Sequence, residues 1–279
     1  MRRLAAVLAT VMAVAGCGAD EPRPGPTVVV GAGPTRESVL VAELYASALR
    51  YFGTVAQVRT GPDPVAALDG GLVTVAPGFT GDLLTRFAPH PAARADEQVY
   101  REMISALPEG VAAGDYTASA QDKPAAAVTA NTAKSWDAHD VTAVLAHCPG
   151  ITVGAVAGAA HPAKLGDCVL PETHEFRDTA ALFDALKRGE VTLGWTSTAS
   201  PPAPADTEVL TDRTSLIRAE NIVPLYRRNL LSEQQVLALN GIAGELDTAT
   251  LADMVGQVDK GADPAAVAGA WLAQHPLDH

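Results

Sequence analysis

The stretch Thr27-Val28-Val29-Val30-Gly31-Ala32-Gly33-Pro34-Thr35 contains the signals that set the class of fold. The β-branched run from Thr27 to Gly31 predicts a buried strand, and the glycines and proline after it predict a turn. Thr35 is a suitable helix cap for the segment that follows. That segment carries an apolar stripe at helical spacing, made of Leu40, Val41, Leu44, Ala48 and Leu49. A strand, a turn and a helix in this order predict an α/β fold, with a helix N-terminus able to receive an anion.

The glycines of this turn do not make a nucleotide site. Gly31-Ala32-Gly33 lacks the third glycine of a dinucleotide-binding loop, and no Gly-Lys-Ser or Gly-Lys-Thr follows it. The sequence therefore predicts no nucleotide cofactor.

The first residues have the features of a secretory signal. Arg2 and Arg3 precede a short apolar run from Leu4 to Ala15, which is followed by Gly16 and Cys17. This run is too short for a membrane-spanning helix, which needs about 20 residues.

The ending Val14-Ala15-Gly16-Cys17 is similar to the lipidation signal of bacterial lipoproteins. Residues 1–16 are then expected to be removed as a signal peptide, and Cys17 is expected to carry the lipid that anchors the protein outside the cell membrane. Residues 17–26 contain three prolines and are expected to form a tether. An ordinary secreted protein with a chance cysteine is the alternative.

Composition limits the classes of partner. The chain has 279 residues, of which 263 remain after removal of the signal, enough for one large or two medium domains. Apolar residues make up 48% and charged residues 19%, which predicts a packed globular protein. The formal net charge is −12, and loss of Arg2 and Arg3 makes it −14. Such an acidic chain repels nucleic acid and anionic lipid, so membrane attachment is expected from the lipid alone.

Cys148 and Cys168 remain when Cys17 is lipidated, an even pair in an oxidising compartment. A disulfide between them would stabilise the protein by roughly 3 kcal/mol. The alternative is a metal site with the nearby histidines His139, His147, His161 and His174. Their spacing matches no zinc pattern, so the disulfide is favoured and no metal is expected.

Two distant stretches repeat one pattern. The segment from Leu68 to Val75 precedes Pro77-Gly78-Phe79-Thr80, and the segment from Leu186 to Leu193 precedes Gly194-Trp195-Thr196-Ser197-Thr198. Each reads as a helix end, a glycine stop, a short strand, and a loop with one aromatic residue and several hydroxyls. Because ligands bind beyond the carboxyl ends of strands in open α/β sheets, two such units suggest two lobes that share one cleft. Chance repetition within an α/β protein is the alternative.

The end of the chain is expected to be helical. Ser232 caps a helix over Glu233 to Asn240, and Gly241 is expected to end it. Asp263-Pro264 predicts the start of a later helix. The spacing of its apolar residues makes Trp271 a core residue.

Dispersed motifs together resemble the substrate-binding lipoproteins of ABC importers for glycine betaine, choline and carnitine. The opening strand, turn and acidic helix start of that family are similar to Val28–Ser38, and its glutamate-tyrosine-threonine-glycine loop to Gly78–Gly81. Its paired hydroxyls after a strand of the second lobe are similar to Thr196-Ser197-Thr198. Its proline-containing return segment is similar to Val223–Arg228, and its closing helix to Pro264–Leu272.

This resemblance implies an α/β fold of the bilobal, type II periplasmic-binding-protein kind, with two lobes joined by two hinge crossings. Residues 27–118 and 212–279 would form lobe 1, and residues 119–211 would form lobe 2. The chain would cross between the lobes near residues 117–120 and 210–212.

The resemblance also implies a ligand site in the cleft. A quaternary ammonium has no hydrogen to donate, so a protein holds it with aromatic faces, each contributing roughly 0.5–2 kcal/mol. A ligand carboxylate needs donors such as hydroxyls or helix N-termini. Candidates for the aromatic cage are Phe79, Trp195 and Tyr226. Candidates for the donors are Ser38, Thr80, Ser197 and Thr198. Each aromatic candidate also has an interpretation as an ordinary packing or surface residue.

The sequence departs from the family pattern at three points. No aromatic residue lies in the stretch Asp122–Ala126, where the family commonly has a tyrosine. Ala199 stands where an aspartate often follows the hydroxyl pair, and Phe79 replaces a tyrosine. Fewer rings and hydroxyls weaken the expectation of a betaine ligand more than the expectation of the fold.

The function expected from these features is a solute receptor without catalytic activity. It would act as a monomer outside the cytoplasm and deliver a small molecule, betaine-like or related, to an ABC permease and its ATPase. One alternative is a lipoprotein that binds a ligand as a sensor or scaffold. A secreted hydrolase is disfavoured because Gly-x-Ser-x-Gly and motifs of metal-ligand spacing are absent from the sequence.

Overall fold

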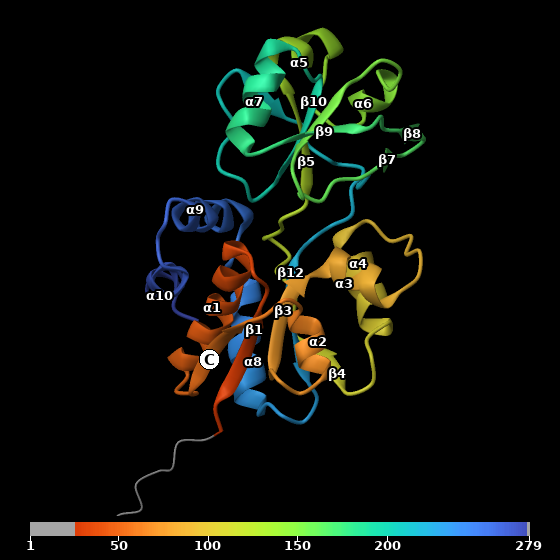
Figure 1. Cartoon of the computed structure of the whole chain (residues 1–279). Helices are drawn as coiled ribbons and strands as arrows, with labels where there is room; N and C mark the ends of the chain where they lie inside the picture. The colour runs from red at the N-terminus through yellow and green to blue at the C-terminus, as the bar shows by residue number, and fades with distance from the viewer. Residues whose placement is uncertain (1–25, 278–279) are drawn as a thin grey trace, which may run out of the picture.

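Two five-stranded β-sheets form two separate lobes, which lie end to end in the long direction of the molecule (Figure 1). This computed structural model describes residues 26–277. The predicted signal peptide, Cys17 and nearly all of the tether lie outside the described residues.

Lobe 1 contains the sheet with strand order β2-β1-β3-β12-β4. Its strands are β1 (Val28–Ala32), β2 (Ala56–Thr60), β3 (Val75–Phe79), β4 (Val111–Ala113) and β12 (Ile222–Arg227). Strand β1 is parallel to β2 and β3, whereas β12 runs antiparallel between β3 and β4. A strand from the end of the chain thus completes a sheet built from its beginning.

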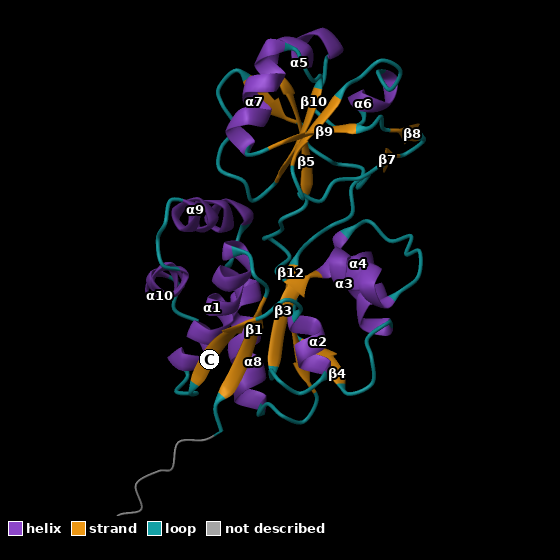
Figure 2. Cartoon of the chain, in the orientation of Figure 1, coloured by secondary structure: helices purple, strands orange, loops and turns teal. Residues whose placement is uncertain are grey.

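Helices cover both faces of this sheet (Figure 2). They are α1 (Arg36–Tyr51), α2 (Pro64–Asp69), α3 (Thr80–Phe87), α4 (Asp96–Ser105), α8 (Glu233–Glu245), α9 (Thr248–Asp259) and α10 (Pro264–Gln274). Helix α1 packs against α8, α9 and α10 to form the larger core cluster, which includes Trp271 as predicted. Helices α3 and α4 pack together in the second cluster of this lobe.

Lobe 2 contains the sheet with strand order β11-β5-β10-β6-β9. Its strands are β5 (Pro124–Thr129), β6 (Val153–Val156), β9 (Thr173–Phe176), β10 (Leu193–Ser197) and β11 (Thr207–Val209). Its helices are α5 (Ala130–Trp136), α6 (Ala143–Ala146) and α7 (Thr179–Arg188). A small ribbon of β7 (Lys164–Leu165) and β8 (Cys168–Val169) lies at one side, and a disulfide joins Cys168 to Cys148.

The opening stretch of sequence forms the predicted unit. Strand β1 is followed by a turn and by α1, and the side chain of Thr35 accepts a hydrogen bond from the backbone N–H of Ser38. This cap provides an acceptor for one of the N–H groups that a helix start leaves unpaired.

The repeated pattern is also present, with one difference. Helices α2 and α7 end at glycines, and Gly71 and Gly189 have φ angles of 72° and 71°, which only glycine adopts at low cost. Phe79 and Trp195, however, lie within β3 and β10 and not in loops after them. Strand pairing extends to these residues, because Phe79 is opposite Ile222 and Trp195 is opposite Ala126.

The expectation that Gly241 ends a helix is wrong. Helix α8 continues through this residue to Glu245. A Cβ atom at position 241 would lie 3.1 Å from Leu277, so the glycine allows the end of the chain to pack closely against α8.

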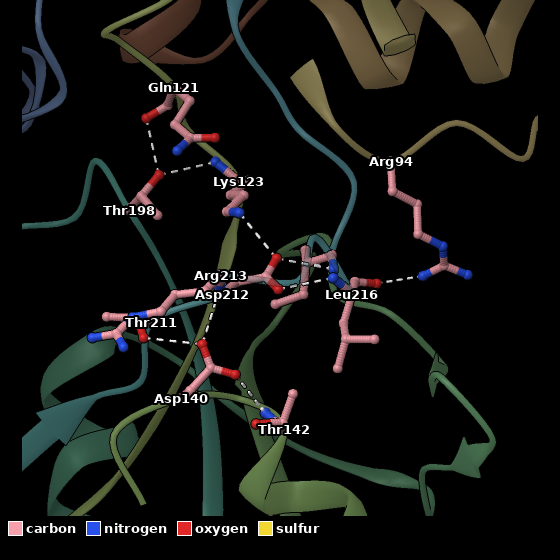
Figure 3. A network of polar contacts seen from close by, with 11 residues as sticks. Arg94, Gln121, Lys123, Asp140, Thr142, Thr198, Thr211, Asp212, Arg213 and Leu216 are labelled. Carbon is pink, nitrogen blue, oxygen red and sulfur yellow. Dashed lines mark hydrogen bonds and ion pairs between the residues drawn. The ribbon is translucent and has the colours of Figure 1, made fainter. Parts of the chain in front are cut away.

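Two segments, residues 117–123 and 210–221, connect the lobes and are called the hinge below. Near lobe 1, the buried amide of Asn221 donates to the carbonyls of Thr117 and Ala120, which binds one segment to the other. Near lobe 2, Lys123 Nζ lies 3.0 Å from Asp212 Oδ2 (Figure 3). The second crossing extends beyond residue 212, because Ile217 packs in the core of lobe 2 and Ala219 packs in that of lobe 1.

Candidate functional site

A cavity of about 540 Å³ lies between the two lobes and is called the cleft below. Lobe 1 and the hinge contribute Thr35, Glu37, Phe79, Asp82, Asp122 and Glu220 to it. Lobe 2 contributes Thr179, Trp195, Thr196, Ser197 and Ser200, together with Pro124, Val156 and residues 158–160. Another cavity, of about 420 Å³, is lined by residues of lobe 2 alone. We take the cleft as the candidate site because both lobes line it.

The topology explains why these residues meet. Phe79 is the last residue of β3, and Val156 and Ser197 are the last residues of β6 and β10. Glu37 and Thr179 lie in the first turns of α1 and α7, each of which follows a strand. The cleft thus lies at the carboxyl ends of strands from both sheets, where α/β folds bind ligands.

Phe79 and Trp195 line this cleft from opposite lobes. Trp195 has an exposed fraction of only 1% and packs in the core of lobe 2, yet it also lines the cleft. Its indole Nε1 is buried and has no hydrogen-bond partner. A buried donor without a partner costs free energy, so this N–H is available to an acceptor.

Of the predicted donors, only Ser197 lines the cleft. Ser200 lies beside it, and its hydroxyl donates to Ser197 Oγ at 3.2 Å. Thr196, which the sequence analysis did not select, also lines this wall.

The other three predicted donors bond within the protein. Ser38 Oγ accepts from the backbone N–H of Gly33 at 2.6 Å, and Ser38 lines a neighbouring cavity of about 450 Å³ in lobe 1. Thr80 is fully buried and its hydroxyl accepts from the backbone N–H of Asn221. Thr198 Oγ1 donates to the carbonyl of Gln121 and accepts from the backbone N–H of Lys123 (Figure 3). Thr80 and Thr198 thereby fix the hinge to the two walls of the cleft.

Tyr226 lies far from the predicted cage. It is opposite Val75, at the start of β3, whereas Phe79 is at the other end of that strand. Because β12 runs antiparallel to β3, its last residues are carried away from the cleft, and Tyr226 lines a different cavity with Arg228 and Leu237. The sequence motif correctly located the strand, but the direction of that strand removes its tyrosine from the site.

Four carboxyl groups of the cleft were missed by the sequence analysis. They are Glu37, Asp82, Asp122 and Glu220, called the acidic wall below. Of the described residues that line the cleft, none is Lys, Arg or His. The neighbouring Lys123 is bonded to Asp212, so its charge is already compensated (Figure 3).

Burial and mutual repulsion raise the pKa values of three members of this wall, Glu37, Asp82 and Glu220. Burial raises the pKa of Glu37 from 4.5 to about 9, and the nearby carboxylates of Asp122 and Asp259 act in the same direction. Burial, together with the charge of Asp82, raises the pKa of Glu220 to about 8. Burial also raises the pKa of Asp82. These side chains therefore hold protons at pH values at which an exposed carboxyl group has lost them.

Two further kinds of site were sought in the described part of the chain. Within residues 26–277, no cluster of three or more His, Cys, Asp or Glu side chains is arranged to hold a metal ion. No described helix has the length and apolar character required to span a bilayer.

The fold matches solved structures of solute-binding proteins. The structure of a glycine betaine/carnitine/choline ABC transporter protein has a TM-score of 0.74 and 16% identity, and the match covers 89% of this chain and 98% of that one. Apo YehZ from Escherichia coli has a TM-score of 0.69 and 20% identity, covering 90% and 99%. An ABC-transporter choline binding protein in complex with choline has a TM-score of 0.56 and 18% identity, covering 90% and 89%. These similarities confirm the bilobal, type II periplasmic-binding-protein fold.

A comparison with curated protein sequences found no match. The sequence profile described as "Substrate binding domain of ABC-type glycine betaine transport system", by contrast, matches residues 26–274, which is nearly all of the described chain. The chain therefore belongs to the family of substrate-binding domains of ABC-type glycine betaine transport systems.

Proposed function

We propose that this protein is the extracytoplasmic receptor of an ABC importer, and that it binds a small solute between its lobes. The main support is the cleft of about 540 Å³, to which Phe79 of lobe 1 and Trp195 of lobe 2 both contribute. A solute held between them contacts both walls at once, so its binding energy depends on how the lobes are placed relative to each other.

The hinge gives this proposal a physical mechanism. Two chain segments join the lobes, and a solute that contacts both walls shifts the population toward the closed arrangement. The closed form would then present both lobes to a permease. The bonds of Thr80 and Thr198 to the hinge connect the two walls of the cleft to the segments that must move.

The test is a binding screen on the purified protein by thermal unfolding and calorimetry. The solutes are glycine betaine, choline, carnitine, proline, amines and sugars. A solute that binds only the folded state stabilises it by about 2.7 kcal/mol at 100 times its Kd. We expect at least one solute to raise Tm, and Phe79→Ala to weaken that binding at least tenfold.

The matched control is Phe87→Ala. Phe87 ends α3 in the same lobe, and it does not line the cleft. The Phe87→Ala variant should bind the solute with the same affinity as the unsubstituted protein. The proposal fails if no solute raises Tm, or if Phe79→Ala leaves the affinity unchanged.

We further propose that a lipid on Cys17 holds the receptor at the outer surface of the cell membrane. The support is the signal-like sequence before Cys17. In cell fractionation, the natural protein should be found with membranes and Cys17→Ser with the soluble proteins. Delivery to a permease predicts that cells without this protein lose uptake of the solute found in the screen.

A further inference from the structure

The charge of the cleft is one-sided. Its acidic wall has four carboxyl groups, and no basic side chain of the described residues lines the cleft with them. Arg36, beside Glu37 in the chain, donates to the carbonyl of Val258. Arg218 donates to Thr85 Oγ1 and to the carbonyls of Pro91 and Ala93, and its charge lowers the pKa of Asp82 and of Glu220. Arg218 therefore partly compensates Asp82 and Glu220, whereas no basic side chain of the described residues that line the cleft compensates Glu37 and Asp122.

Four backbone donors beside the cleft already bind carboxyl groups of the protein. At the start of α3, the backbone N–H groups of Gly81 and Asp82 both donate to Glu220 Oε2, at 2.9 and 3.0 Å. At the start of α7, the N–H of Ala181 donates to its cap Asp178. Behind Ser197, the N–H of Ala199 donates to Asp122. A carboxylate entering the cleft would find the N–H groups at these helix starts already bound to carboxyl groups of the protein.

Two buried polar atoms of the cleft-lining side chains lack partners. Glu37 Oε1 is buried and unpaired, although the Glu37 carboxyl group also hydrogen-bonds to Asp122. A proton shared between two carboxyl groups can be replaced by the N–H groups of an ammonium or guanidinium ion. These groups hydrogen-bond to both carboxylates and also neutralise their charge. On the other wall, Trp195 Nε1 is a donor without an acceptor, in a side chain that is 99% buried.

We propose that the cleft selects a small cation that carries N–H donors and an uncharged oxygen acceptor, and that it excludes solutes with a carboxylate. The N–H groups bond to Glu37 and Asp122, and the acceptor receives the indole N–H of Trp195. This inference rests on the proposed solute-binding function and specifies the solute class. With Phe79 and Trp195 as its aromatic residues, the cleft surrounds a fully methylated ammonium incompletely, whereas its carboxyl groups match N–H donors directly.

The test is a calorimetric comparison of four probes on the purified protein at pH 7.5. L-argininamide has two cationic groups with N–H donors and an uncharged amide carbonyl. L-arginine differs from it by a carboxylate in place of the carboxamide, so this pair isolates the effect of that charge. Choline and glycine betaine supply the fully methylated ammonium, without and with a carboxylate. We expect argininamide to bind at least tenfold more tightly than each of the other three.

The variants connect this selectivity to the acidic wall. Glu37→Gln keeps a donor to Asp122, so it should fold, but it cannot release a proton to become the carboxylate that pairs with a bound cation, so it should weaken argininamide binding at least tenfold. Glu97→Gln is the matched control, because Glu97 is exposed on α4 outside the cleft. It should change the affinity less than twofold.

Three results would overturn the inference: no binding of argininamide, equal or tighter binding of arginine, choline or glycine betaine, or an unchanged affinity in Glu37→Gln. Tighter binding of choline or glycine betaine that Phe79→Ala abolishes would refute the solute class while leaving the proposed receptor function intact. The proposal of a receptor function is refuted only if Phe79→Ala weakens the binding of no solute in the wider screen.

Discussion

The raised pKa values of Glu37 and Glu220 make single side chains of the cleft sensitive to pH. In both, burial is the largest cause, and a neighbouring carboxylate adds to it. Their charged forms are better solvated in water than in the cleft, so burying these carboxyl groups lowers the free energy of unfolding of the protein. Such a cost is typical of residues kept for binding.

This cost predicts how stability depends on pH. The pKa in the folded state lies above the unfolded value of 4.5 for both Glu37 and Glu220. The folded state therefore binds protons at these two groups more strongly than the unfolded state does. The stability that this proton binding contributes is complete below about pH 4.5 and is lost as the pH rises toward 8 and 9. The free energy of unfolding should fall by roughly 1 kcal/mol per pH unit for each group, which lowers Tm by a few degrees per unit.

The measurement is Tm of the unliganded protein at pH 5.5, 6.5, 7.5 and 8.5. Glu37→Gln should have a clearly shallower dependence, and Glu97→Gln should reproduce that of the unsubstituted protein. If Glu37→Gln has the same slope as the unsubstituted protein, Glu37 does not carry a raised pKa.

Trp195 should report solute binding by its fluorescence. It is the described tryptophan that lines the cleft, whereas Trp271 packs in lobe 1 and Trp136 stacks on His147. Trp195→Phe should remove most of the change in emission that a bound solute causes. It should also weaken binding about fivefold, because one hydrogen bond is worth about 1 kcal/mol. Trp136→Phe is the control, and a full fluorescence change in Trp195→Phe would place the solute elsewhere.

At the scale of residues, the sequence indicated that Phe79 and Trp195 share one cleft, but it placed Tyr226 with them wrongly and it missed the carboxyl groups. Phe79 and Trp195 could be predicted because each lies in a short strand that follows a recognisable glycine stop. Asp122 and Glu220 could not, because they lie on separate hinge segments that only the three-dimensional structure brings together. Glu37 was visible in the sequence as an acidic helix start, which is an ordinary feature of exposed helices as well.

Among the segments of the fold, the hinge depends most on buried polar contacts. Lys123 and Asp212 have side-chain exposures of 12% and 3%, and Asp212 also accepts the backbone N–H groups of Leu216 and Ile217 (Figure 3). Asp212 therefore fixes the second crossing and, through Lys123, the first.

Removing one member of this pair should be costly. Lys123→Met leaves the buried carboxylate of Asp212 without its cation, and we expect a loss of about 3 kcal/mol in the free energy of unfolding. Adding Asp212→Asn should recover part of that loss, because the uncompensated charge is then removed. Urea unfolding of the two single variants and the double variant measures this. Strictly additive losses would show that the two side chains do not interact.

Two glycines provide a matched test of packing within elements. Gly154 is in β6 beneath α7, and a Cβ there would lie 2.7 Å from Phe176 and 2.9 Å from Leu182. Gly154→Ala should therefore destabilise the protein by about 1–3 kcal/mol. Gly244 is in α8, with nothing within 4 Å of the added atom, and Gly244→Ala should stabilise it by about 0.5–1 kcal/mol. Thermal unfolding would contradict this account if both changes had the same sign.

The elements themselves were largely predictable from local signals. Caps at Thr35, Ser232 and Asp263 mark helix starts because their side chains accept backbone N–H groups in the first turn. The exception, Gly241, depends on Leu277, a contact between residues of different segments. A local pattern cannot distinguish a glycine that ends a helix from one that accommodates a neighbour.

For the molecule as a whole, the order of the strands decides what the cleft contains. Strand β12 returns to the first sheet after lobe 2 is complete, and the two chain crossings beside it become the hinge. The family resemblance predicted this arrangement, but composition and periodicity alone could not, because they carry no information on which distant segments pair. The same antiparallel return excludes Tyr226 from the site.

The central claim is that one solute contacts both lobes and thereby closes them. Nitroxide labels on exposed residues of the two lobes, at Arg101 of α4 and Asp184 of α7, allow the interlobe distance to be measured by pulsed electron paramagnetic resonance. With the tightest-binding solute at saturation, the distance should shorten by several ångströms, and Phe79→Ala should show no shortening at the same concentration. An unchanged distance in the saturated, unsubstituted protein would contradict the claim.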